Sequence, residues 1–158
     1  MPEVKKMEKL SVKGVIIDQI SDMPYIILKT EDGKQAVSIG VGPAEAIAII
    51  MALDHLKAPR PLTHDLFVHF FLLHRFRVEK VEIYKMVGSK YFARLYYRKG
   101  LRRHQLELRP SDALALAVRL RTPIYVSRGI IEQQLDLGRL FEDGTYFRSD
   151  PSLFEYKN

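Results

Sequence analysis

The chain has 158 residues, a formal net charge of +6 and no cysteine, which excludes disulfides, zinc–thiolate sites, iron–sulfur clusters and thiol nucleophiles. Its 47% hydrophobic and 28% charged residues are typical of a globular protein with one domain, or with two small halves that share a core. It contains no run of 18 apolar residues and no secretory leader, so we expect a cytoplasmic protein that does not span a membrane.

The first half of the chain predicts three strands followed by two helices. Residues rich in β-branched side chains predict strands at 10–20, 23–30 and 34–41. A helix begins at Pro43, and it should be buried because residues 44–53 are apolar except for Glu45. Thr63 is expected to cap the second helix, whose core face would consist of Leu66, Phe67, Phe70, Phe71 and Leu73.

The second half repeats this order of elements. Strands are expected at 78–87, 91–98 and 102–108, followed by an apolar helix over 110–121. A short strand at 122–126 and a short helix to about residue 135 complete the body. The tail over 136–158 carries five aromatic residues, which is unusual for a free tail, so we expect it to dock on the body or on another subunit.

The two apolar helices begin with motifs of the same kind. Gly42-Pro-Ala-Glu-Ala-Ile-Ala-Ile49 matches Arg109-Pro-Ser-Asp-Ala-Leu-Ala-Leu116 in residue type at each position. We interpret the chain as an internal duplication of a three-strand plus helix unit, with repeats at about 10–75 and 76–135 in one domain over 1–135. The fold class predicted is α+β, with a mixed, mostly antiparallel sheet and buried helices. Because one unit cannot bury its apolar helix alone, the halves should pack on each other.

The first candidate for chemistry is Thr63-His64-Asp65, in which a histidine and a carboxylate could activate water or hold a metal. The structural alternative is an ordinary helix start, with Thr63 as the cap and Asp65 opposing the helix dipole. The other histidines of this helix do not strengthen the first interpretation, since His69 and His74 point to other faces.

The second candidate is the pair Glu45 and Asp112, each near the start of a buried helix. Each acid by itself is explained by the helix dipole. If the repeats face one cleft, however, two carboxylates there, together with Asp65, could bind a divalent cation such as Mg²⁺ or Mn²⁺ and polarise a phosphodiester. Arg60 or Arg109 would then suit the phosphate through a bidentate guanidinium.

The third candidate is a basic hairpin between Lys85 and Arg103, a segment that contains no acid. Alternation along the strand interleaves cations with aromatic rings, a pattern that can follow a phosphate backbone and stack bases. The alternative is a solvated edge strand protected by charge. The candidate substrate-binding cations of this segment are Lys90, Arg94, Arg98, Arg102 and Arg103.

Three separated motifs make the chain resemble the bifunctional nuclease domain family: Glu45-Ala46, Arg60-Pro-Leu-Thr-His-Asp65, and Arg109-Pro-Ser-Asp-Ala-Leu-Ala-Leu116 followed by Pro123-Ile-Tyr-Val126. The resemblance covers roughly residues 8–135 and implies a nuclease of DNA and RNA. It departs from the family pattern at Glu107, where an Asp is usual, and at Asp54-His-Leu-Lys57, which lacks a usual Gly. The site residues that the resemblance implies are Glu45, Arg60, Thr63, His64, Asp65, Arg109, Ser111 and Asp112.

The preferred hypothesis is therefore a metal-assisted, sequence-nonspecific nuclease in which His64 is the general base, Glu45, Asp65 and Asp112 are metal ligands, and arginines contact the phosphate. The alternative is a non-catalytic nucleic-acid-binding or regulatory module in which the same residues are structural. A nucleotide sensor is a third possibility, but Pro43 and Pro110 each remove an amide donor at a helix start. We also expect a homodimer, and a composition with a single Asn and many Lys, Arg and Glu is compatible with a thermophilic source.

Overall fold

The computed structural model describes residues 6–138, so the predicted docking of the tail lies largely outside the described residues. Its strands are β1 (Met7–Ile17), β2 (Pro24–Thr30), β3 (Ala36–Gly40), β4 (Arg77–Val87), β5 (Lys90–Lys99), β6 (Arg102–Leu108) and β7 (Ile124–Ser127). Its helices are α1 (Pro43–Leu53), α2 (Thr63–Leu73), α3 (Pro110–Leu120) and α4 (Arg128–Gly138). None of these helices has the length and apolar character needed to cross a membrane.

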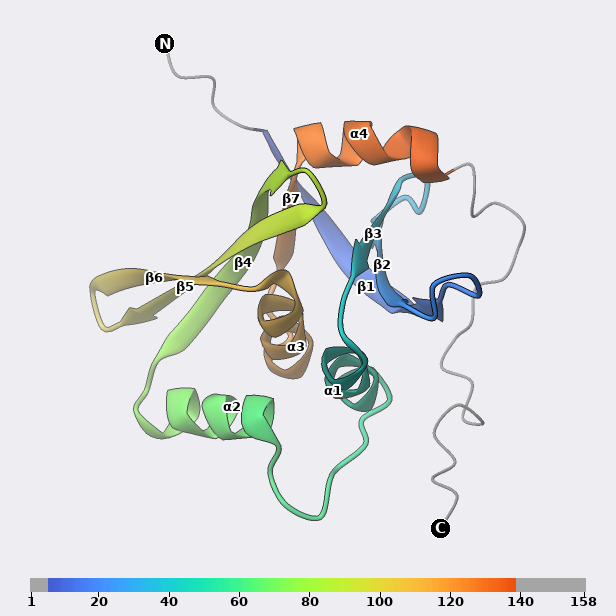
Figure 1. Cartoon of the computed structure of the whole chain (residues 1–158). Coiled ribbons are helices and arrows are strands. Elements are labelled where there is room, and N and C mark those ends of the chain that lie inside the picture. Colours follow the sequence, from blue (N-terminus) through green and yellow to red (C-terminus); the bar gives the residue numbers. More distant parts are fainter. Residues whose placement is uncertain (1–5, 139–158) are drawn as a thin grey trace.

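The strands form one seven-stranded sheet in the order β3-β2-β1-β7-β4-β5-β6. Every neighbouring pair is antiparallel except β4 and β7, which run parallel. The sheet therefore consists of two wings that meet at the short strand β7, with α1 and α3 between them (Figure 1). This confirms the predicted α+β class and mostly antiparallel sheet, whereas the duplication itself stays a prediction.

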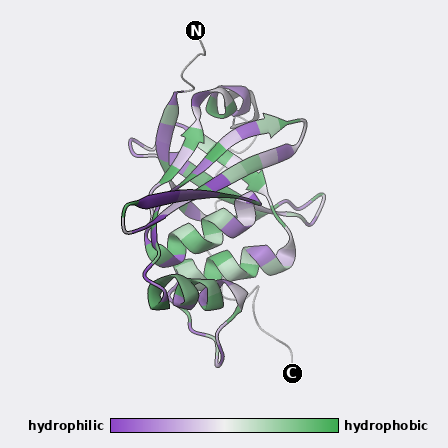
Figure 2. Ribbon diagram, turned by 90° about the vertical axis from the view of Figure 1, so that its left-hand side faces the viewer, coloured by the Kyte–Doolittle hydropathy of each residue, from purple (hydrophilic) through white to green (hydrophobic). Residues whose placement is uncertain are grey.

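The core lies where α1 and α3 pack against each other and against the sheet. Five consecutive residues of α3, from Ala113 to Ala117, are buried, as expected for a helix that is apolar on nearly all sides. Figure 2 shows these helices gathered beneath the sheet, while β6 crosses in front as a hydrophilic strand. Packing against α1 and the sheet therefore fixes the position of α3, which begins directly after β6.

Several predicted boundaries are shifted, including the start of the first strand at Met7, the bounds of β3 and those of β7, and two further shifts bear on the fold. The first strand ends at Ile17 and not at residue 20, because the Asp18 carboxylate accepts hydrogen bonds from the Ile20 amide (3.2 Å) and the Ser21 hydroxyl (2.6 Å). These local bonds fold residues 18–22 into a turn. The last helix continues to Gly138, beyond the expected end near residue 135.

Helix α2 differs most from its prediction. It packs mainly on α3 and the start of β4, and Phe71 is its only fully buried residue. The other four residues of its predicted core face are exposed, so that expectation was wrong for them: Leu66, Phe67, Phe70 and Leu73. The predicted cap was also wrong, since the helix is capped at Leu62, whose amide donates to the Asp65 carboxylate at 2.9 Å.

Candidate functional site

The first turns of α1 and α3 face each other, and α2 begins beside α3. Each of the three helices carries a carboxylate at its third residue, namely Glu45, Asp65 and Asp112. An acid at this position is favoured by the partial positive charge of the helix N-terminus. The local sequence therefore places one carboxylate at each helix start, and packing of the helices decides what each one meets.

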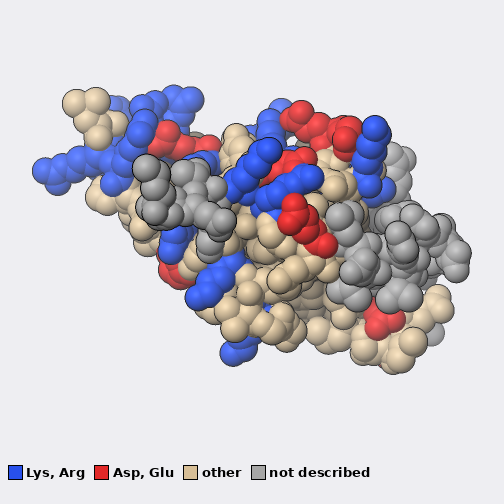
Figure 3. Space-filling view, turned by 90° about the horizontal axis from the view of Figure 1, so that it is seen from above, with Lys and Arg blue, Asp and Glu red and all other residues tan. Residues whose placement is uncertain are grey.

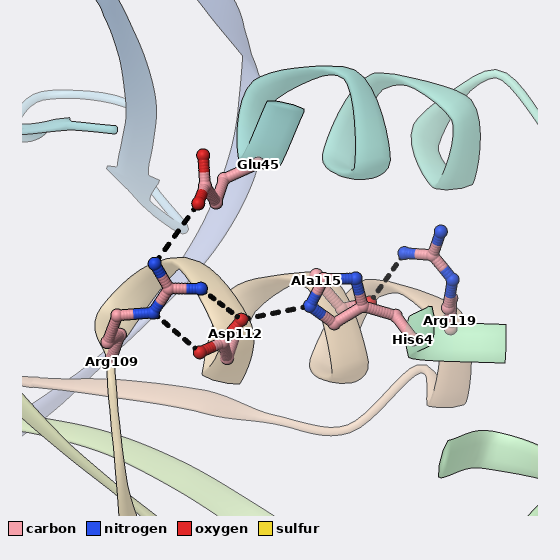
Figure 4. Close-up of polar contacts among 6 residues, drawn as sticks. All are labelled: Glu45, His64, Arg109, Asp112, Ala115 and Arg119. Carbon is pink, nitrogen blue, oxygen red and sulfur yellow. Dashed lines mark hydrogen bonds and ion pairs between the residues drawn. The ribbon is translucent and has the colours of Figure 1, made fainter. Parts of the chain in front are cut away.

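Arg109, the residue just before α3, links two of these acids. Its Nε and Nη2 donate to the two oxygens of Asp112 at 2.9 and 3.1 Å, and its Nη1 donates to Glu45 Oε1 at 3.1 Å. Figure 4 shows the guanidinium lying between the two carboxylates, one on α1 and the other on α3. Because 64% of the Arg109 side chain remains exposed, the guanidinium is also open to a ligand.

His64 lies on the other side of Asp112. Its Nε2 is 3.0 Å from Asp112 Oδ1, and only 14% of the imidazole side chain is exposed. Partial burial opposes ionisation of Asp112, but the hydrogen bonds from Arg109 and His64 outweigh it and lower the pKa of this carboxyl. Asp112 is therefore an ionised acceptor, and with a proton on Nε2 the histidine keeps its Nδ1 lone pair.

Asp65 does not pair with its neighbour His64. Its Oδ1 accepts a hydrogen bond from Arg119 Nε at 2.8 Å, and its Oδ2 caps α2. Burial opposes ionisation of Asp65 as well, yet the bonds from Arg119 and from the Leu62 amide lower its pKa. The predicted histidine–carboxylate pair thus joins His64 to Asp112, and Asp65 belongs to a separate pair that fastens α2 to α3.

Gly42 has a steric role in placing Glu45. A Cβ at this position would lie 2.3 Å from Glu45 Oε2, well inside van der Waals contact. The residue just before α1 is therefore small where the residue just before α3 is the long Arg109. This asymmetry lets the Glu45 carboxylate fold back over the start of α1 while Arg109 reaches across to it.

A half-open cavity of about 710 Å³ lies beside these groups, within the size range of ligand sites. Glu45, His64, Arg109 and Asp112 form its polar end. Its other walls are mostly apolar and come from all three helices and from β5 and β6, including Ile47, Leu62, Phe67, Leu106 and Leu108. The site thus joins a charged rim to an apolar hollow.

Two residues carried by the motifs lie elsewhere. Arg60 is exposed in the loop between α1 and α2 and is not part of the cavity wall. Ser111 is buried at the start of α3 and does not line the cavity either. Thr63 does line it, next to His64.

The cations of the basic hairpin do not line this cavity, although Leu95 of β5 does, and two of them are paired with acids. Arg94 donates to Glu107 at 3.2 Å and stacks 3.9 Å from the Tyr84 ring, and Arg103 lies 3.6 Å from Glu79. Arg102 is exposed at the hairpin tip opposite Lys99, and Arg98 pairs with Arg103 one position further along the strands. Lys90 is exposed at the opposite end of β5. Figure 3 shows Lys and Arg concentrated toward the end of the molecule where this hairpin projects. Six residues of extended chain put Arg103 roughly 20 Å from Arg109.

The three acids predicted as metal ligands do not converge. Glu45 and Asp112 are bonded to Arg109, and Asp65 is bonded to Arg119. Between residues 6 and 138, no group of three or more His, Asp or Glu is arranged to hold a metal ion. The donor set as arranged does not fit Mg²⁺ or Mn²⁺, which prefer several free carboxylate oxygens, and the predicted cation stays a prediction.

Sequence reasoning missed Arg119 and Gly42. Arg119 is the only charged residue after Asp112 in α3, and its side chain is 9% exposed. A single arginine in the apolar part of a helix indicates an acidic partner on a neighbouring element, and this was the available signal. The steric role of Gly42 could not be predicted from the sequence. Its φ of −71° is one that any residue adopts, so the need for glycine comes from the nearby Glu45 carboxylate and not from the backbone.

Comparison with known proteins gives a consistent result. The family model of the bifunctional nuclease domain matches residues 26–136. An uncharacterized protein of Mycobacterium tuberculosis is 29% identical over 127 residues, which are 80% of this chain and 76% of that protein. Bifunctional nuclease 1 of Oryza sativa subsp. japonica is 34% identical over 109 residues, covering 66% of this chain but 33% of the rice protein. Bifunctional nuclease 2 of Arabidopsis thaliana is 28% identical over 131 residues, covering 80% and 39%.

Proposed function

Because the chain belongs to the bifunctional nuclease domain family, we propose that it is a nuclease that hydrolyses phosphodiester bonds of DNA or RNA. The observation that supports this best is the contiguous row Glu45–Arg109–Asp112–His64 at the rim of a cavity. It combines a base with a phosphate-binding cation, the two groups that hydrolysis of a phosphodiester requires.

In this proposal His64 is the general base. Asp112 accepts a hydrogen bond from Nε2–H, which fixes the ring orientation and leaves Nδ1 to take a proton from the attacking water. As the water oxygen bonds to phosphorus, the P–O bond to the leaving oxygen breaks, and the imidazolium returns the proton to that oxygen. The lowered pKa of Asp112 keeps it ionised, so it stabilises the imidazolium that forms. Asp112 is thus a positioning residue that acts through His64.

Arg109 binds the phosphate. The three hydrogen bonds to Glu45 and Asp112 use three of the five N–H donors of a guanidinium, so two donors remain for phosphate oxygens. The two carboxylates hold the guanidinium plane in place before the substrate arrives, which lowers the entropic cost of binding. The apolar walls of the cavity receive the sugar and base that flank the phosphate.

A non-catalytic nucleic-acid-binding module is the second candidate. It is favoured by the fact that each site carboxylate is already bonded to an arginine, an arrangement that also serves to hold three helices together. In that case the row of residues would stabilise the fold and the hairpin cations would provide the binding. The two candidates predict different effects of replacing His64: the nuclease would lose cleavage, whereas the binding module has no cleavage to lose.

The test uses purified full-length protein and fluorescently labelled single-stranded DNA, duplex DNA and RNA. His64→Ala should lower the cleavage rate by about 10²- to 10⁴-fold, the usual contribution of a general base, while leaving binding within a few-fold of wild type. His69→Ala, an exposed histidine on the same helix, is the matched control and should cleave normally. Equal cleavage by both variants would reject the proposal, and tight binding without cleavage by wild type would favour the second candidate.

A further inference from the structure

Helix α2 exposes an apolar stripe from Leu66 to Leu73. Leu66, Phe67, Phe70 and Leu73 are 62%, 50%, 50% and 77% exposed. At 100° per residue these four positions fall within a sector of about 120° on one side of the helix, which we call the α2 stripe. Phe71 and His64 lie next to this sector and pack against the body, whereas Leu72, which is also 63% exposed, lies outside the sector.

Within residues 6–138, no other element buries the α2 stripe. Scattered exposed apolar residues are ordinary, but four on one helical face form a continuous patch, and such patches mark interaction surfaces. The side chains are large, and together they expose on the order of 500 Å². That is a substantial part of the roughly 800 Å² that each partner buries in a stable interface.

Charge indicates which partner fits. The only Lys, Arg, Asp or Glu of α2 is Asp65, and Arg119 already neutralises it at 2.8 Å. A nucleic acid requires cations on the surface that binds it, and the stripe has none. A second copy of this chain, which carries a net charge of +6, is repelled least when it approaches through an uncharged apolar face.

We propose that the α2 stripe is the centre of a homodimer interface in which α2 packs against α2 of a second copy. A two-fold axis makes the interface self-complementary, and the spacing of Leu66, Phe70 and Leu73 is the four-and-three spacing of helices that pack along a seam. Phe67 belongs both to the stripe and to the cavity wall. The second copy therefore covers the outer side of the cavity and excludes water from it.

The test is the oligomeric state of the full-length chain, measured by sedimentation equilibrium between 1 and 100 µM, about the range expected for interfaces of this size. Wild type should be a dimer. Leu66→Glu and Leu73→Glu should each shift it to monomer, because each variant would bury a carboxylate without a partner in both halves of the interface. Leu101→Glu, at the fully exposed tip of the β5–β6 hairpin, is the matched control and should remain dimeric.

Each outcome decides the proposal without reference to cleavage. A wild-type monomer at all concentrations overturns it and assigns the stripe to a different partner. A dimer that both α2 variants leave intact places the interface elsewhere and overturns it as well. Circular dichroism of the variants guards against misfolding, and since positions 66 and 73 are well exposed, the monomeric variants should melt as cooperatively as the Leu101→Glu control.

Discussion

Arg109 donates a hydrogen bond to Glu45 across 3.1 Å, although Glu45 lies in α1 and Arg109 lies just before α3. Within residues 6–138, this hydrogen bond joins α1 to the row that ends at His64, so the position of Arg109 depends on both α1 and α3. If Arg109 binds the phosphate, then Glu45 controls how well it is oriented. The consequences can be measured.

Removing the charge of Glu45 should weaken substrate binding more than the chemical step. We expect Glu45→Gln to raise KM several-fold with a smaller change in kcat, because a neutral acceptor replaces one of the two carboxylates that orient the guanidinium. Steady-state kinetics on a single-stranded DNA substrate would measure this. A variant with unchanged KM but a greatly reduced kcat would instead give Glu45 a role in the chemical step.

Gly42→Ala should reproduce part of that effect without touching a charge. The new Cβ would lie 2.3 Å from Glu45 Oε2, so the carboxylate must move, and we expect the hydrogen bond from Arg109 to its other oxygen to weaken. The matched control is Gly129→Ala in α4, where the nearest atom, Ser127 Oγ, is 3.8 Å away. Equal KM values for the two variants would contradict the steric role of Gly42.

Asp65 should matter for stability and not for catalysis. Asp65→Ala removes the cap of α2 and leaves the buried Arg119 unpaired, which should lower the free energy of unfolding by about 2 kcal/mol. Urea denaturation measures this, with Asp54→Ala, an exposed acid at the end of α1, as the control. Adding Arg119→Met to the Asp65→Ala variant should restore part of the lost free energy of unfolding. If the two substitutions instead lower that free energy by the sum of their separate effects, Asp65 and Arg119 do not interact.

Acid should destabilise the protein through the same groups. Because the pKa values of Asp65 and Asp112 are lowered in the folded state, their contribution is complete above the unfolded carboxyl pKa of about 3.9 and is lost as pH falls through the folded values. The free energy of unfolding should therefore fall below about pH 4. Asp65→Asn should flatten that decline, and an unchanged slope would remove Asp65 from this account.

Chelation tests the predicted cation. Since the three candidate acids are bonded to Arg109 and Arg119, we expect cleavage to persist in excess EDTA. Activity that disappears with EDTA and returns with Mg²⁺ or Mn²⁺ would mean that the carboxylates leave the arginines to bind the ion. Arg109→Lys, which gives up the bidentate bond to Asp112, would then be expected to bind the cation more tightly.

The sequence by itself determined the strands and helices, and it determined which charged side chain lies in the first turn of each helix. β-branched runs gave the strands, Pro43 and Pro110 marked two helix starts, and each of three helices received an acid in its first turn. These features depend on residues close in the chain, which is why local rules predicted them.

Only the tertiary structure decided which charged groups meet. His64 pairs with Asp112 and not with the adjacent Asp65, because neighbouring side chains on a helix diverge by about 100° and α2 presents one to the start of α3 and the other to Arg119. The exposure of the α2 stripe could likewise not be predicted from the periodicity of apolar residues. The same spacing occurs in a helix face that packs on its own chain and in one that binds another chain. Partner choice is a property of packing between distant segments, and that information is carried by the fold.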